Sequence, residues 1–184
     1  MNMLASRGQL RASFIRWALF LVPLCVLLGF LSGMFGSPDT AWFQGLEKPG
    51  IYPEPKWFGI VWTVLYVMIG LAVALVAAAW GARGRTVALW VFAGHFALNL
   101  SWSYVFFGAQ QLSGALYLLV AIVFTLLAVI ALFWRVRRLA AVLLVPYLAW
   151  VCFATALNYQ FLQLNPDADG ANTEGAVERV RIGN

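Results

Sequence analysis

Hydrophobic positions in this chain fall into five long runs that are separated by polar breaks. The runs cover residues 14–36, 57–80, 86–107, 113–134 and 140–162. Each is about 20 residues long, the length at which an α-helix crosses a hydrocarbon core of ~30 Å. None alternates with a period of two, and an open strand cannot satisfy its backbone hydrogen bonds in lipid. The pattern therefore predicts an all-α membrane protein, a bundle of five transmembrane helices.

The polar segments are unequal in length. The breaks at 81–85, 109–112 and 135–138 have only a few residues, whereas 37–56 is a substantial loop. This loop runs into KPGIYPEPKW, whose three prolines fix φ and exclude regular helix, so we predict a stiff segment. The residues 163–184 are rich in glycine, asparagine and acidic side chains, a composition that predicts a disordered tail.

Charge separates the two sides of the predicted bundle. Eight arginines and no acidic residue lie near the N-terminus and in the breaks at 81–85 and 135–138. The loop 37–56 and the tail together carry four basic and seven acidic residues. Because positive side chains favour the cytoplasmic side, we predict that residues 1–13 are cytoplasmic and the C-terminus lies outside, in a bacterial cell membrane. This alternation needs an odd number of spans and so supports five independently.

Composition excludes several classes of protein. The chain is 63% hydrophobic and 10% charged, whereas a soluble domain carries roughly 25% charged residues. No charged residue lies well inside a run, which argues against an ion channel or an ion-coupled transporter. The arginines are explained by topology, so we expect a lipid bilayer and no nucleic acid as partner. Cys25 and Cys152 lie within apolar runs, which predicts small buried side chains and no metal site.

One face of the third run carries most of the polar side chains of the predicted spans. At helical spacings of i, i+4, i+7 and i+11, it consists of His95, Asn99, Trp102 and Phe106. Because a polar side chain that faces lipid is costly, we expect this face to point into the bundle. There, His95 and Asn99 either hydrogen-bond to neighbouring helices or bind a ligand, and the sequence leaves both alternatives open.

Two further runs carry faces of the same kind. They consist of Trp62 and Tyr66 on the second run and of Tyr147, Trp150, Ala154 and Asn158 on the fifth. Three such faces in one bundle would enclose an apolar pocket with aromatic walls and a few hydrogen-bonding groups, which suits a large planar ligand. On the first run, Gly29 and Gly33 form a small-xxx-small pair that permits close helix approach, either inside the bundle or in a dimer.

Four sequence blocks resemble one known family. They are GLEKPGIYPEP, FGIVWTVLY, NLSWSYVFFG and PYLAWVCFATALNY, and they occur in order between about Trp17 and Asn165. In these blocks the chain resembles the translocator protein family, whose members are also called tryptophan-rich sensory proteins or peripheral benzodiazepine receptors. The resemblance implies a five-helix bundle, often a homodimer, that binds porphyrins such as protoporphyrin IX or a haem-like tetrapyrrole. In some members it implies sterols or benzodiazepine-type ligands.

The resemblance also implies roles for individual residues. It places pocket positions at Trp62, Tyr66, Asn99, Trp150 and Ala154, under a lid formed by 37–56 with Trp42, Pro49, Tyr52 and Pro53 as candidates. The lid departs from the family, because Ile51 replaces an aromatic residue and Glu54 interrupts a Pro-Pro pair. Gln163 stands where the sterol-recognition pattern of animal members needs Lys or Arg, so sterol is not expected as the main ligand.

Together these observations predict a membrane protein that binds a tetrapyrrole in an aromatic pocket and acts as a sensor or regulator, without an obligatory cofactor. One alternative is light-dependent porphyrin degradation, with Trp62 and Trp150 as the catalytic candidates. Another is transport of a porphyrin or a sterol-like ligand. The lack of a recognisable inverted repeat or broken helix in the sequence disfavours transport.

Overall fold

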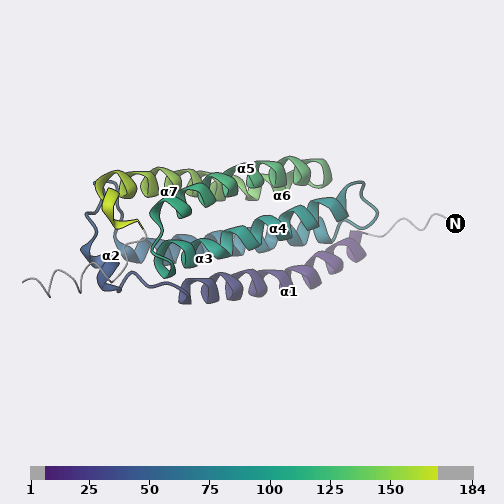
Figure 1. Cartoon of the computed structure of the whole chain (residues 1–184). Helices are drawn as coiled ribbons and strands as arrows, with labels where there is room; N and C mark the ends of the chain where they lie inside the picture. Colours follow the sequence, from purple (N-terminus) through teal and green to yellow (C-terminus); the bar gives the residue numbers. More distant parts are fainter. Residues whose placement is uncertain (1–6, 170–184) are drawn as a thin grey trace, which may run out of the picture.

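The computed structural model describes residues 7–169, and all secondary structure in this range is helical. Figure 1 shows long helices that run side by side along one axis and are joined by turns at the two ends of the bundle. In chain order the elements are α1 (Arg7–Met34), α2 (Ala41–Gly45), α3 (Pro55–Ala77), α4 (Arg85–Ser103), the π-helix Tyr104–Gly108, α5 (Leu112–Val136), α6 (Arg138–Leu143), α7 (Val145–Leu164) and the 3₁₀ turn Pro166–Ala168. The predicted all-α fold is therefore confirmed for these residues.

Within the described part of the chain, four helical segments are long and apolar enough to cross a membrane. They are Gly8–Met34, Pro55–Ala77, Leu112–Val136 and Arg138–Leu164. They overlap four of the five predicted spans, and the chain is accordingly an integral membrane protein. The remaining predicted span, 86–107, is the third in chain order and coincides with α4 and the π-helix. There the α-helix already ends at Ser103, and histidine, asparagine and serine lower the hydropathy.

The last predicted span, 140–162, is a helix with a break. α6 ends at Leu143 and α7 begins at Val145, because Pro146 has no backbone N–H to bond the carbonyl four residues earlier. The Leu148 N–H donates to the Leu144 carbonyl at 3.0 Å and continues the helical ladder. The two helices therefore still form one path through the bundle.

An arginine closes the turn between α3 and α4. Gly84 is the N-cap residue that precedes α4 and has a φ of 78°, a left-handed conformation that glycine adopts without a steric penalty. Arg85 donates from Nε and Nη2 to the Ala77 carbonyl at 3.0 and 2.7 Å, which satisfies a carbonyl at the open end of α3. Its guanidinium also lies 4.2 Å from the centroid of the Trp80 ring. This arginine therefore holds two helices together at the turn.

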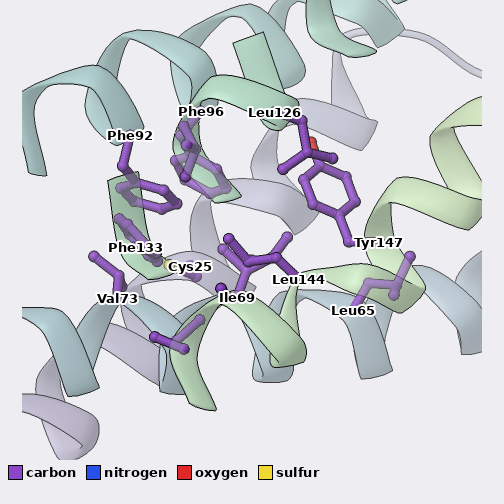
Figure 2. Close-up of a cluster of buried hydrophobic side chains, with 14 of the residues drawn as sticks. Cys25, Leu65, Ile69, Val73, Phe92, Phe96, Leu126, Phe133, Leu144 and Tyr147 are labelled. Atoms are coloured by element: carbon purple, nitrogen blue, oxygen red, sulfur yellow. The ribbon is translucent and has the colours of Figure 1, made fainter. Parts of the chain in front are cut away.

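The centre of the bundle is a core of buried side chains around α3. Figure 2 shows side chains from several helices meeting there, among them Cys25, Leu65, Ile69, Val73, Phe92, Phe96, Leu126, Phe133, Leu144 and Tyr147. Cys25 is buried, as predicted. The prediction was wrong for Cys152, which is exposed because its position on α7 faces away from the neighbouring helices.

Glycines set the distance between α1 and α3. A Cβ atom at Gly70 of α3 would lie 2.6 Å from the Cα atom of Val22 on α1, closer than real Cβ contacts come. A Cβ atom at Gly29 of α1 would overlap the ring of Tyr66 on α3. The sequence left open whether Gly29 serves the bundle or a dimer, and the structure uses it inside the bundle.

We predict that Gly70→Ala destabilises the protein by about 1–3 kcal/mol, because the new methyl group overpacks the contact with the α1 backbone. The matched control is Gly94→Ala on α4, where a Cβ atom would meet nothing within 4 Å. Thermal unfolding of both variants in detergent, followed by circular dichroism, measures the difference. Equal melting temperatures for the two variants would contradict the role assigned to Gly70.

Candidate functional site

Two adjoining cavities lie between the helices. The inner cavity, of about 410 Å³, is enclosed by α1, α3, α4, α5 and α7. The outer cavity, of about 360 Å³, lies towards the lid and is bounded by residues of α2 and of the π-helix. The two share a wall that consists of Gly33, Phe58, Gly59, Trp62, Trp102, Ser103 and Ala154. Each volume falls in the range of roughly 300–1,000 Å³ that is typical of small-molecule sites.

Most of the residues predicted to bind ligand line these cavities. The inner cavity is lined by Trp62, Tyr66, Asn99, Trp102, Trp150 and Ala154. The outer cavity is lined by Tyr52, Trp62, Trp102, Phe106, Ala154 and Asn158. The helical spacing read from the sequence thus brings side chains from α3, α4 and α7 to one place.

One face of α3 provides an aromatic wall. Trp62 stacks on Tyr66, with ring centroids 5.3 Å apart and an interplanar angle of 25°. Phe58 lies one turn earlier on the same face and meets the Trp150 ring edge-on at 5.8 Å. Phe58 lines both cavities but was not among the predicted residues. Its position four residues before Trp62 was a usable signal, because residues four apart share a helical face.

The π-helix places two successive phenylalanines in the wall of the outer cavity. Its wide turn is closed by the Ala109 N–H, which donates to the Tyr104 carbonyl at 2.7 Å. Phe106 and Phe107 both line the outer cavity. Neighbouring residues of an α-helix point about 100° apart, so the periodicity predicted Phe106 and missed Phe107. Single-turn π-helices are often found at functional sites.

The lid is built on the short helix α2. Thr40 caps α2 by accepting a hydrogen bond from the Phe43 N–H at 3.3 Å. Phe43 is buried against the π-helix and α7, with ring centroids 5.1 Å from Phe107 and 5.8 Å from Phe161. Phe43 lines the outer cavity and was also missed, because a five-residue helix is too short to show a periodicity.

A lysine closes the other end of α2. The Lys48 ammonium group donates to the carbonyls of Phe43 and Leu46, the latter at 2.8 Å. It also lies 4.4 Å from the centroid of the Phe43 ring. Partial desolvation at this position lowers the pKa of Lys48 from its ordinary value. The positive charge thus lies among carbonyls at the C-terminal end of α2, where the helix dipole favours a cation.

The predicted lid residues occupy different places. Tyr52 lines the outer cavity, and partial burial raises the pKa of its hydroxyl. Trp42 donates from Nε1 to the Ala168 carbonyl at 3.1 Å. Pro49 accepts a hydrogen bond from the Tyr52 N–H at 2.9 Å, and neither Pro49 nor Pro53 lines the two cavities.

The end of α7 clamps the lid. Asn165 accepts from the Glu47 N–H at 2.8 Å and donates to the Glu47 carbonyl at 3.0 Å, so one amide pairs with one backbone unit. Asp169 accepts from the Ser113 N–H at 3.0 Å at the start of α5. The prediction of a disordered tail is therefore wrong for 163–169, which these side-chain bonds tie to the lid and to α5. Its remaining part, 170–184, lies outside the described residues.

His95 and Tyr147 lie deeper than the cavities and line neither of them. His95 contacts Thr125 through Nδ1 at 2.9 Å and Tyr147 through Nε2 at 3.1 Å. Asn99 accepts a hydrogen bond from the Tyr66 hydroxyl at 3.2 Å and also lines the inner cavity. The sequence left open whether these side chains hydrogen-bond to neighbouring helices or bind a ligand. His95 hydrogen-bonds to neighbouring helices, whereas Asn99 makes such a bond and also lines the inner cavity.

Among residues 7–169, no cluster of His, Cys, Asp or Glu has the arrangement of a metal site.

Three buried polar atoms lack a hydrogen-bond partner among the described residues, and all belong to residues that line the cavities. They are Trp102 Nε1, Trp150 Nε1 and Asn158 Oδ1. Native proteins leave few buried polar atoms unpaired, because each costs about 1–3 kcal/mol. The residues of the cavity walls thus include two hydrogen-bond donors and one acceptor that no described protein group satisfies.

We predict that Asn165→Ala loosens the lid, because it removes both hydrogen bonds to Glu47. Hydrogen exchange of the backbone amides in 37–54 measures this, and we expect faster exchange there with little change in α3. Gln163→Ala is the control, since Gln163 is exposed on the last turn of the same helix. An unchanged exchange rate in Asn165→Ala would contradict the clamp.

The chain is similar in sequence to known proteins over most of its length. The signature of the TspO/MBR family matches residues 21–164. The chain is 41% identical over 148 residues to the tryptophan-rich protein TspO of Chlorobaculum tepidum, covering 79% of this chain and 93% of that protein. It is 36% identical over 151 residues to the tryptophan-rich sensory protein of Cereibacter sphaeroides, covering 81% and 92%. It is 40% identical over 124 residues to the human translocator protein, covering 64% and 71%. The chain therefore belongs to the TspO/MBR family.

Proposed function

We propose that this membrane protein binds a tetrapyrrole, such as protoporphyrin IX, in the two adjoining cavities and acts as a sensor or regulator of that ligand. The lid between α1 and α3 covers the site, and the ligand spans the wall that the cavities share. Membership of the TspO/MBR family supports a role in the membrane, and its relatives include a protein named for a sensory function.

The observation that carries this proposal is the set of unpaired polar atoms on residues that line the aromatic cavities. The indole N–H groups of Trp102 and Trp150 are donors that suit carboxylate or carbonyl oxygens, while Asn158 Oδ1 is an acceptor that suits an N–H group. A tetrapyrrole offers a flat apolar body together with both kinds of group. Its faces match rings such as Trp62, because offset stacking and edge contacts favour flat partners.

We further propose that α4 and the π-helix form a fifth crossing. Together they run from Arg85 to Gly108. They pack against α3 and α5, which are two of the four segments long and apolar enough to cross a membrane. The buried side chains of His95 and Asn99 point into this packing, so the polar residues that lower the hydropathy are shielded from lipid. The arginine-rich turns then lie on the cytoplasmic side and the lid lies outside.

Trp150→Phe should weaken the binding of protoporphyrin IX by about threefold to tenfold, because it keeps an aromatic ring but removes one hydrogen-bond donor. The change in porphyrin absorbance during titration of the purified protein measures the affinity. Trp134→Phe is the control, since Trp134 is exposed at the opposite end of the bundle and lines neither cavity. Equal affinities for the two variants would remove Trp150 from the site, and no saturable binding to the unmodified protein would refute the proposed function.

Single cysteines test the fifth crossing. In a background with Cys25→Ala and Cys152→Ser, we expect Gln44→Cys and Ala109→Cys to react with a membrane-impermeant maleimide in intact cells. Ala82→Cys should react only after lysis, because it lies at the other end of α3 and α4. Reaction of Ala82→Cys and Ala109→Cys under the same condition would show that α4 does not cross.

A further inference from the structure

Helix α1 changes its neighbour along its length. In its middle it packs on α3, where Gly29 lies against the ring of Tyr66 and Gly70 lies against the α1 backbone. Towards its C-terminus it is bonded to α4 instead, because the Ser32 hydroxyl donates to the Leu100 carbonyl at 2.5 Å. The last turns of α1 are therefore fixed to α4 and not to α3.

Two glycines keep this second contact close. A Cβ atom at Gly36, just beyond α1, would lie 2.7 Å from the carbonyl oxygen of Ser103 at the end of α4. A Cβ atom at Gly108, the last residue of the π-helix, would lie 3.0 Å from the carbonyl oxygen of Phe35. Since neither glycine leaves room for a side chain, the backbones meet directly and the end of α1 is held against the π-helix.

A gap separates α1 from α3 on the lid side of their contact. Gly33 of α1 and Gly59 of α3 line both cavities and are exposed, and a Cβ atom at either position would meet nothing within 4 Å. The exposed residues in the wall of the inner cavity all belong to these two helices. They are Phe30, Gly33 and Met34 of α1 and Gly59 and Thr63 of α3. The cavities therefore reach the surface of the bundle between α1 and α3, at what we call the lateral opening.

The lateral opening lies at a depth where a membrane provides lipid. Thr63 comes eight residues after Pro55, which begins α3, and at 1.5 Å per residue this is about 12 Å along the helix. Because the hydrocarbon core is ~30 Å thick, the opening falls within the leaflet on the lid side. The side chains of Phe30 and Met34 on its rim are each 70% exposed and apolar, which suits contact with acyl chains.

The route past the lid is obstructed by comparison. Phe43 is buried and packs against the ring of Phe107, and Asn165 holds the backbone of Glu47 with two hydrogen bonds. Passage of a large ligand there requires these contacts to break. The lateral opening requires no such step, because the contacts of α1 with α4 and the π-helix hold it in place.

We propose that the ligand enters and leaves the cavities sideways, from the membrane leaflet on the lid side, through the gap between Gly33 and Gly59. The ligand class that this route admits is a flat, largely apolar molecule dissolved in the bilayer, since the rim consists of glycine, threonine and apolar side chains. The bilayer concentrates such molecules. This inference rests on the proposed function for its ligand, but the lateral opening is a property of the protein alone.

Gly59→Leu fills the gap and should slow the association of protoporphyrin IX with the protein in proteoliposomes by about tenfold. Gly33→Leu, on the other side of the gap, should act in the same way. Stopped-flow quenching of tryptophan fluorescence measures the rates. Gly94→Leu is the matched control, because Gly94 is exposed on α4, a Cβ atom there also meets nothing within 4 Å, and it lines neither cavity.

Loosening the lid separates the two routes. In the Gly59→Leu background, Asn165→Ala should leave association slow, because the lid is not the way in. Recovery of the rate in this double variant would assign entry to the lid and overturn the inference. Rates in Gly59→Leu and Gly33→Leu equal to that of Gly94→Leu, with helical content unchanged by circular dichroism, would overturn it as well.

Phospholipids with brominated acyl chains test the opening without a ligand, because bromine quenches the fluorescence of a tryptophan that it contacts. Trp62 lines both cavities close to Gly59, and its signal is the difference between the unmodified protein and Trp62→Phe. We expect this signal to be quenched in the ligand-free protein and less so in Gly59→Leu. Absence of such quenching overturns the inference whether or not a porphyrin binds. Absence of saturable porphyrin binding refutes the proposed function and leaves the opening to be judged by the quenching.

Discussion

The contact of α1 with α3 is the constraint on which the cavities depend. Glycine at 29 and at 70 removes the side chains that would hold the two helices apart, and α1 comes close enough to form a wall of the inner cavity. Lipid is as apolar as a helix surface, so helices in a membrane gain little from apolar burial and associate through steric fit. A wider separation at this contact would expose the aromatic face of α3 to lipid and remove the enclosed space.

The polar groups in the cavity walls are few and neutral, and the apolar surroundings strengthen their interactions. The described spans bury no charged side chain, and the polar groups of the cavity walls are indole, amide and hydroxyl groups in apolar surroundings. Such groups interact more strongly than in water, and they cost more when they are left without a partner. Some, such as Asn99 and Tyr66, are held by neighbours in the bundle, whereas the N–H groups of Trp102 and Trp150 have no hydrogen-bond partner among the described residues. The protein therefore combines fixed and unsatisfied groups in one wall.

Sequence reasoning located residues that line the cavities where local helix geometry decides the outcome. The faces of α3, α4 and α7 follow from a spacing of three and four residues, which led to Trp62, Asn99 and Ala154. It missed Phe107, because the π-turn shifts the register at one point and no periodicity shows it. It also missed the contribution of α1 to the inner cavity, because Gly29 and Gly33 had indicated only a close helix approach and residues 17–31 are apolar on all sides. The clamp of Asn165 on Glu47 joins residues 118 positions apart, and such a pairing cannot be read from neighbouring residues.

The bonds that hold the lid have a consequence for how the protein responds to its solution. Lys48 is held by backbone carbonyls and by an aromatic ring, and Asn165 pairs with the neutral peptide unit of Glu47. These contacts join a charge to dipoles, or dipoles to each other, at short range. Salt screens interactions between exposed charges over distances of about 8–10 Å and acts far less on such contacts. The position of the lid is therefore set by local geometry and changes little with ionic strength.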